Sequence, residues 1–285
     1  MHKAVKVCVG FWLCAAACFA ADPPEWRQPF AAHRVVGNIY YVGTYDLASF
    51  LIVTPAGNVL VNGGLADSAP TIRKSVEDLR FAWKDVRWML TTQAHFDHVA
   101  AFAEIQRTTG ARVLATAADA VLLEDGGKSD FHFTGAEYHY APVKVAERIA
   151  DGQVLKFGGT EITVYLHPGH TKGSASYAIP VTEGGRTYQV LIANIGSINP
   201  GVKLLGEKNY PGIAEDYART FEKQKALTCD IFLSSHAAQY GLHRKYTPGA
   251  AYDPARFVDP EGYQKAVAAA EAAYRKQLAE ERAAR

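Results

Sequence analysis

Short apolar runs, turn residues and amphipathic segments alternate along most of the chain. Branched and aromatic residues at 35–42 and 50–61 predict strands, with turns at Gly37-Asn38 and Pro55-Ala56-Gly57. The same patterns predict further strands at 86–91, 113–116, 161–166, 174–180, 187–194 and 230–235. They also predict helices at 68–80, after QAHFDH (93–98) to about Gly110, and at 117–125, 212–227 and 260–285.

Strands that alternate with helices in this way are typical of the α/β class. Residues 120–160 are less regular, but no linker interrupts the chain, so we predict one domain over residues 21–285. On the last predicted helix five residues share one face at helical spacing, which indicates packing against the core. These are Tyr263, Val267, Ala270, Tyr274 and Leu278.

The first twenty residues have the pattern of a secretory signal. Two lysines precede an uncharged apolar run at 7–19, and two alanines follow it. This run is too short for a typical membrane span, which disfavours an uncleaved anchor. A lipid anchor on Cys18 is disfavoured because Ala15 is small where such signals prefer a large apolar residue. We predict a signal peptide over 1–20 and a mature chain that is free of the membrane.

Composition limits the kinds of binding partner and the kinds of cysteine chemistry that the chain can have. The 285 residues include 30 Lys plus Arg and 29 Asp plus Glu, a formal net charge of +1. This balance gives no electrostatic basis for binding nucleic acid or an anionic membrane. Three of the four cysteines lie within residues 1–20, so the mature chain keeps only Cys229. A single thiol forms neither an internal disulfide nor a cysteine-rich zinc site.

The segment QAHFDH at 93–98 carries the strongest chemical signal. It follows a predicted strand and places an amide and three potential metal ligands within six residues, namely Gln93, His95, Asp97 and His98. Asp97 near the start of a helix stays ionised, because the helix dipole favours negative charge there. A polar turn with a capping Asp and two exposed histidines is the alternative, but His-x-Asp-His at a strand end favours a metal site.

Two later histidines also follow predicted strands. His170 lies in HPGHTKGS (167–174), where Pro and Gly turn the chain so that His170 points back over the strand end; His167, before the turn, is a weaker candidate. His236 ends the segment SSH after an apolar strand, and on its own it would be more typical of a core histidine. Because strand ends share one rim of a sheet, we expect these side chains to converge.

The number of candidate ligands is enough for two metal ions. Catalytic zinc commonly keeps three protein ligands and leaves one position for water. Nitrogen and oxygen donors without thiolate favour zinc, with manganese and iron as alternatives. We assign to a first ion Gln93, His95 and His170, and to a second ion Asp97, His98 and His236.

The order and spacing of these motifs resemble the metallo-β-lactamase superfamily over nearly the whole mature chain. Four segments resemble β-lactamases of subclass B3: NGGL at 62–65, GHTKGS at 169–174, SINPGVKL at 197–204 and YPGIAEDYARTF at 210–221. SSHAAQYGLH at 234–243 resembles the branch of that subclass in which Gln replaces the first ligand His. The resemblance implies a four-layer αβ/βα sandwich, with two zinc ions at one edge between the sheets. It also implies a periplasmic enzyme that hydrolyses penicillins, cephalosporins and carbapenems, and we expect a monomer.

Two positions differ from patterns in the superfamily. Gln93 stands where His is usual, and because an amide oxygen is a weaker donor than imidazole, the first ion should be held less tightly. Glyoxalase-type and lactonase-type relatives carry a bridging Asp after the GHT segment, where this chain has Ala193-Asn194. A neutral amide is a poor bridge between two cations, which favours the lactamase arrangement in which His236 completes the second site.

The resemblance also implies a mechanism. A hydroxide shared by the zinc ions attacks the strained amide carbonyl, and Asp97 orients it. Ser197 and Asn199 would donate hydrogen bonds to the substrate carboxylate, although a plain Pro-Gly turn is an alternative for this segment. Tyr210 and the stretch 127–140 would line the mouth. The other functions to weigh are hydrolysis of a thioester, lactone or phosphoester on the same fold, and a non-catalytic metal-binding role.

Overall fold

The computed structural model describes residues 22–285, so the predicted signal peptide lies outside the described part of the chain. Its strands form two sheets. The first contains β1 (His33–Val36), β2 (Ile39–Tyr41), β3 (Phe50–Ile52), β4 (Asn58–Val61), β5 (Val86–Leu90), β6 (Arg112–Thr116) and β7 (Val145–Ile149). The second contains β8 (Val154–Phe157), β9 (Thr160–Leu166), β10 (Ala175–Glu183), β11 (Arg186–Ala193) and β12 (Ile231–Ser234).

The two sheets differ in strand direction. The first has the order β1-β2-β3-β4-β5-β6-β7, antiparallel from β1 to β4 and parallel from β4 to β7. The second has the order β12-β11-β10-β9-β8 and is antiparallel except for the parallel pair of β11 and β12. The parallel connections in the first sheet run through helices, as such connections usually do.

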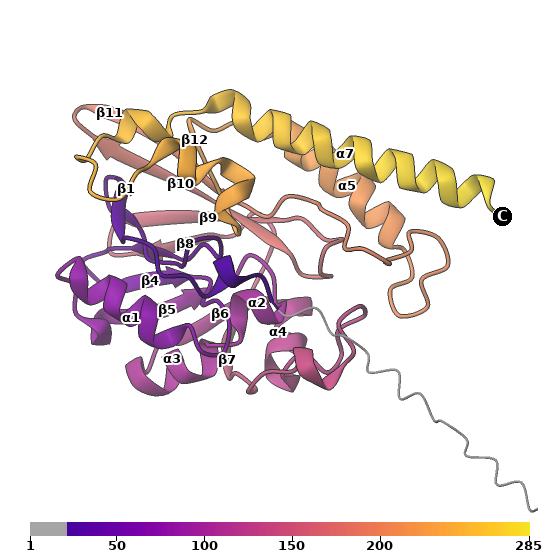
Figure 1. Cartoon of the computed structure of the whole chain (residues 1–285), viewed down its shortest axis with the longest axis horizontal. Coiled ribbons are helices and arrows are strands. Elements are labelled where there is room, and N and C mark those ends of the chain that lie inside the picture. Colours follow the sequence, from indigo (N-terminus) through magenta and orange to yellow (C-terminus); the bar gives the residue numbers. More distant parts are fainter. Residues whose placement is uncertain (1–21) are drawn as a thin grey trace, which may run out of the picture.

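Helices cover the outer face of each sheet (Figure 1). Alternate residues of β3 and β4 face opposite ways: Leu51 and Leu60 pack with the helices outside the first sheet, whereas Phe50 and Val61 pack toward the second sheet. The layers are therefore helix, sheet, sheet, helix, and the predicted αβ/βα sandwich is confirmed. The helices are α1 (Ala69–Asp78), α2 (Phe96–Val99), α3 (Phe102–Thr109), α4 (Ala117–Asp125), α5 (Ile213–Ala226), α6 (Leu242–Lys245) and α7 (Pro260–Ala283).

The structure differs from the predicted elements in two places. The helix expected after QAHFDH to about Gly110 begins earlier, at Phe96, and is two helices, α2 and α3, separated at Ala100-Ala101. The irregular stretch 120–160 contains β7 and β8, which lie at the edges of the two sheets. In β7 the three middle residues are exposed, so the strand lacks the alternation of apolar and polar residues that would reveal it.

Four strands end at one edge of the sandwich. In the second sheet β9, β11 and β12 run the same way, so their carboxyl ends share a rim. The end of β5 in the first sheet meets this rim, because Ala175 N donates to Thr92 O at 2.9 Å and the hydroxyls of Thr92 and Ser235 lie 2.8 Å apart. The rim at which we expected the candidate ligands to converge is thus formed by the strand ends of both sheets. Within residues 22–285 no helix is long and apolar enough to cross a membrane.

Candidate metal centre

All six predicted ligands lie at this shared rim. Gln93 and His95 occupy the turn after β5, and Asp97 and His98 lie in the short helix α2 that follows. His170 follows β9, and His236 follows β12. Side chains from three chain segments therefore come from the ends of both sheets to one place.

Asp97, His98 and His236 form the tightest group. One ligand atom from each lies within 4.8 Å of the other two. Asp97 Oδ2 is 3.1 Å from His98 Nε2 and 3.5 Å from His236 Nε2. Burial on its own would raise the pKa of Asp97, but the two imidazoles hold the pKa of this carboxyl well below its usual range. The group therefore presents an ionised carboxylate between two imidazoles.

This group fits a bound cation. His98 is fully buried; its Nδ1 has no hydrogen-bond partner, and its Nε2 faces Asp97 Oδ2 at 3.1 Å without the geometry of a hydrogen bond. Burial lowers the pKa of His98 below its usual value, which favours the neutral ring with a free lone pair. A buried polar atom without a partner is costly, and coordination of a cation between Asp97 and His98 removes that cost. A carboxylate and two imidazoles are a donor set that zinc accepts.

Asp46 contacts the ring nitrogen of His236 on the side opposite Asp97. Its Oδ2 lies 2.8 Å from His236 Nδ1, and its Oδ1 accepts the N–H of Ala238 at 3.1 Å. Burial alone would lower the pKa of His236, but the carboxylates of Asp46 and Asp97 raise it to about 9. The contact to Asp46 turns Nε2 toward Asp97. Carboxylates that orient a histidine in this way are frequent around metal ions.

Of the other three predicted ligands, His95 and His170 lie together, and Gln93 lines the same cavity. The rings of His95 and His170 are 4.7 Å apart between centroids. His170 Nδ1 donates to Ser197 O at 2.8 Å, which leaves Nε2 free; burial and the neighbouring His95 lower the pKa of His170 to about 3. Gln93 Oε1 accepts a hydrogen bond from Asn194 Nδ2 at 3.1 Å, so this oxygen already has a partner.

Two further buried carboxylates, which sequence reasoning missed, support these segments. Asp130 Oδ2 lies 3.3 Å from His95 Nε2, which leaves His95 Nδ1 to face the site. His95 and two backbone N–H groups outweigh burial and lower the pKa of Asp130 to about 2. Asp119 accepts hydrogen bonds from Ala94 N, Thr171 Oγ1 and Gly173 N, all between 2.9 and 3.0 Å.

Asp119 therefore joins the turn after β5 to the turn after β9. Its own pKa is raised to about 6 by burial, which these donors only partly offset. No motif identifies Asp46, Asp119 or Asp130, since each lies far from the ligands in sequence. A single acidic residue in a loop or helix is ordinary until the fold shows its neighbours.

A cavity of about 380 Å³ lies over the predicted ligands. This size is in the range of small-molecule sites. Its wall contains Asn199 and the aromatic rings of Trp26, Phe96, Phe133 and Tyr138. Phe133 and Tyr138 belong to the stretch 127–140 that was expected at the mouth.

Other residues singled out in the sequence lie outside this cavity. Ser197 is not part of the cavity wall, and its Oγ lies 3.2 Å from His170 Nδ1. The hydroxyl of Tyr210 donates to Asp216 at 2.7 Å, and this ring is buried. His167 is buried beside Ser176 Oγ at 2.7 Å, in agreement with its lower rank as a ligand.

Two sheets covered by helices, with a cluster of His and Asp at one shared edge, define a metallohydrolase architecture. The family model for the metallo-beta-lactamase superfamily matches residues 44–183. The beta-lactamase from Chitinophaga pinensis is 42% identical, with a TM-score of 0.88 over 92% of this chain and 98% of that one. This chain belongs to the metallo-β-lactamase superfamily.

Two further solved structures are similar over nearly their whole length. The class B3 di-zinc metallo-beta-lactamase LRA-12 from an Alaskan soil metagenome is 41% identical, with a TM-score of 0.88 over 90% of this chain and 98% of that one. The metallo-beta-lactamase GOB-18 from Elizabethkingia meningoseptica is 38% identical, with a TM-score of 0.87 over 98% and 100% of the two chains.

The similarity to curated proteins is shorter. The hydroxyacylglutathione hydrolase of Acidiphilium cryptum is 27% identical over 103 residues, which are 36% of this chain and 35% of that one. That of Cereibacter sphaeroides is 34% identical over 92 residues, 32% and 29% of the two chains. The chain thus matches about a third of the length of these relatives.

Proposed function

We propose that this chain hydrolyses the amide bond of β-lactam antibiotics with zinc at the rim of the sandwich. The observation that carries the proposal is the cluster of Asp97, His98 and His236 beneath a cavity, in a chain whose full-length relatives are β-lactamases. Those relatives are 38–42% identical over at least 90% of this chain.

The donors support two zinc ions. Asp97, His98 and His236 would hold one ion, and His95, His170 and Gln93 the other, the latter more weakly because the amide oxygen is neutral and already hydrogen-bonded. When bound, zinc lowers the pKa of water toward neutrality and acts as a Lewis acid on a carbonyl oxygen. The buried, ionised carboxylate of Asp97 accepts a hydrogen bond from the attacking water and so orients it.

Other residues bind the substrate and exclude water. The amide of Asn199 is in the cavity wall, where it donates a hydrogen bond to the substrate carboxylate. Ser197 holds His170 through its carbonyl in this structure, so its hydroxyl reaches a substrate only after rotating. Trp26, Phe133 and Tyr138 form apolar walls that pack against the substrate and keep water out.

We further infer that residues 1–20 direct export, and that the remaining domain, 21–285, works in the periplasm as a monomer. The supporting features are the lysines, the apolar run and the alanines at the start of the chain. N-terminal sequencing of the exported protein tests the cleavage position; a mature chain that begins at Met1 contradicts it.

The decisive experiment measures zinc per chain together with hydrolysis of nitrocefin and imipenem by purified residues 21–285. We expect turnover that EDTA abolishes and added zinc restores. A glutathione thioester serves as the competing substrate. Turnover of the thioester without turnover of either β-lactam would overturn the proposal in favour of a thioesterase.

The thioester alternative has less support. The hydroxyacylglutathione hydrolases match only about a third of their own length. At the position where such relatives carry a bridging carboxylate, Asn194 donates its amide hydrogens to Thr92 O and Gln93 Oε1 at 3.2 and 3.1 Å. A neutral amide used in this way leaves no charge to bridge two cations.

A further inference from the structure

The loop at 197–209 connects the metal centre to the outside of the molecule. It has no regular helix or strand, and it begins where Ser197 O accepts hydrogen bonds from His170 Nδ1 at 2.8 Å and Tyr217 Oη at 2.7 Å. Two residues later, Asn199 lies in the cavity wall. The position of this loop therefore decides where the amide of Asn199 sits.

The far part of the loop is held by side chains of α7. The carboxylate of Glu281 accepts the N–H of Leu204 at 3.0 Å and the N–H of Leu205 at 2.8 Å. Gln277 Nε2 donates to Val202 O at 2.7 Å and to Glu281 Oε1 at 2.9 Å. Three backbone groups of the loop thus have their hydrogen-bond partners on one helix.

These contacts matter because the loop backbone is partly buried. Val202 and Leu204 are 5% and 3% exposed. Backbone groups at such positions need partners, since leaving one unpaired is costly. With no sheet or helix of its own to satisfy them, the loop depends on α7 for a single conformation.

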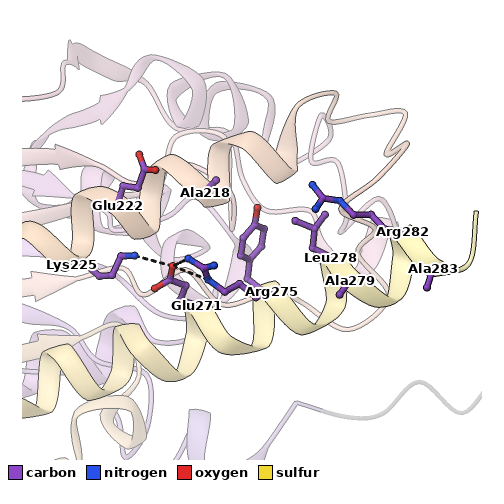
Figure 2. Close-up of a pocket in the computed structure, with 10 residues that line it drawn as sticks. Ala218, Glu222, Lys225, Glu271, Arg275, Leu278, Ala279, Arg282 and Ala283 are labelled. Carbon is purple, nitrogen blue, oxygen red and sulfur yellow. Dashed lines mark hydrogen bonds and ion pairs between the residues drawn. The ribbon is translucent and has the colours of Figure 1, made fainter.

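The helix is a firm support because its other contacts fix it to α5. Lys225 Nζ lies 2.9 Å from Glu271 Oε1, and Tyr274 Oη donates to Ala214 O at 2.9 Å. Figure 2 shows Lys225 and Glu271 facing each other across the groove between the two helices, with Leu278 and Arg282 further toward the carboxyl end of α7. The part of α7 that contacts the loop therefore continues a helix already docked on α5.

We propose that the last turns of α7 position the substrate loop, with Glu281 and Gln277 as positioning residues for the β-lactam carboxylate. The inference rests on the proposed function for its substrate. Glu281 fixes the backbone of Leu204 and Leu205, and this holds residues 199–203 against the core. Asn199 is therefore already in position when the substrate binds. A loop ordered before binding spares the entropy that ordering on binding would cost.

The test compares Glu281→Ala with Glu280→Ala. Glu280 is the neighbouring residue on the same helix and is exposed. Its Oε1 lies 3.9 Å from Lys276 Nζ, and its side chain makes no hydrogen bond to the loop. Hydrogen exchange at the amides of Leu204 and Leu205, zinc per chain, and kcat and KM for imipenem are measured on both variants and on the unmodified protein.

For Glu281→Ala we expect exchange at the Leu204 and Leu205 amides about tenfold faster or more. We expect KM to rise roughly tenfold with kcat within about twofold, because the lost contacts serve binding rather than the chemical step. Zinc per chain should not change. Glu281→Gln, which keeps one acceptor oxygen, should lie between, and Glu280→Ala should match the unmodified protein.

Unaltered KM and amide exchange in Glu281→Ala would overturn the inference, as would an equal rise of KM in Glu280→Ala. If Glu281→Ala does not fold, Gln277→Met serves instead, since it removes the donor to Val202 O and keeps the length of the side chain; the same shifts in exchange and KM are expected. An unmodified protein that turns over no β-lactam refutes the proposed function, whereas one that does so while Glu281→Ala behaves identically refutes only the role of α7.

Discussion

Replacing Asp130 with Asn tests whether a buried carboxylate sets the orientation of His95. Asp130 Oδ1 accepts the N–H of His132 at 2.7 Å and of Phe133 at 2.9 Å, and these two bonds prevent the end of the side chain from turning over. In Asp130→Asn the amide oxygen keeps the hydrogen bonds from the two backbone N–H groups. The new NH₂ group then takes the place of Oδ2, which lies 3.3 Å from His95 Nε2 in the unmodified protein. A ring that binds metal through Nδ1 carries its proton on Nε2, and two donors then face each other.

The expected cost follows from this mismatch. Loss of a partner that orients a ligating histidine typically lowers metal affinity by about 10–100-fold, or roughly 1.4–2.7 kcal/mol. The folded state itself should lose only about 1 kcal/mol, since both backbone bonds to the side-chain oxygen remain. The weaker of the two zinc ions should therefore dissociate first, while the protein remains folded.

Competition with a chromogenic chelator measures the two zinc affinities, and a thermal melt of the metal-free protein measures stability. Asp125→Asn is the matched control, because Asp125 also accepts two backbone N–H groups in the same loop, those of Lys128 and Ser129, but touches no predicted ligand. Equal zinc affinities for Asp130→Asn, Asp125→Asn and the unmodified protein would refute the reasoning.

Three other substitutions probe the site. Gln93→His should tighten the first zinc, and unchanged stoichiometry and affinity would argue against that ligand assignment. His236→Ala should leave about one zinc per chain fewer and remove most activity, at least about 100-fold; near-normal turnover would mean that His236 is only structural. Gly169 has φ +138° and a Cβ there would lie 2.8 Å from the Tyr217 ring. Gly169→Ala should therefore cost about 1–3 kcal/mol of unfolding free energy and displace His170, as denaturant titration and zinc content would show.

Much of the site could be predicted because its residues cluster in short motifs at strand ends. His95, Asp97 and His98 are close in sequence, so their convergence required only a turn after a strand. His170 and His236 required one more step, the rule that neighbouring parallel strands end on one rim. The structure places that rim between two sheets, which the alternation of apolar residues alone does not indicate.

The supporting residues could not be predicted, since each is defined by distance in space. Asp46 is 190 residues from His236, and Asp119 joins the turn at Ala94 to the turn at Thr171, which lies 52 residues beyond Asp119. Glu281 lies on a helix whose apolar face indicated only packing, and its contact with Leu204 spans 77 residues. A charged residue in a loop or on a helix is usually solvated, so no pattern distinguishes these from their neighbours.

The two departures from the family patterns, at Gln93 and Asn194, are in contact and act together. Asn194 Nδ2 donates to Gln93 Oε1, the oxygen that a zinc ion would need, while Asn194 Oδ1 is buried without a partner. An ion at the first site must therefore compete with this bond, which weakens Gln93 as a ligand beyond the weakness of an amide. Exchanging Gln93 for His removes the hydrogen bond from Asn194 with which zinc must compete. It also leaves Asn194 Nδ2 with Thr92 O as its one remaining acceptor. The gain in zinc affinity from Gln93→His should for this reason be accompanied by a loss of stability in the metal-free protein.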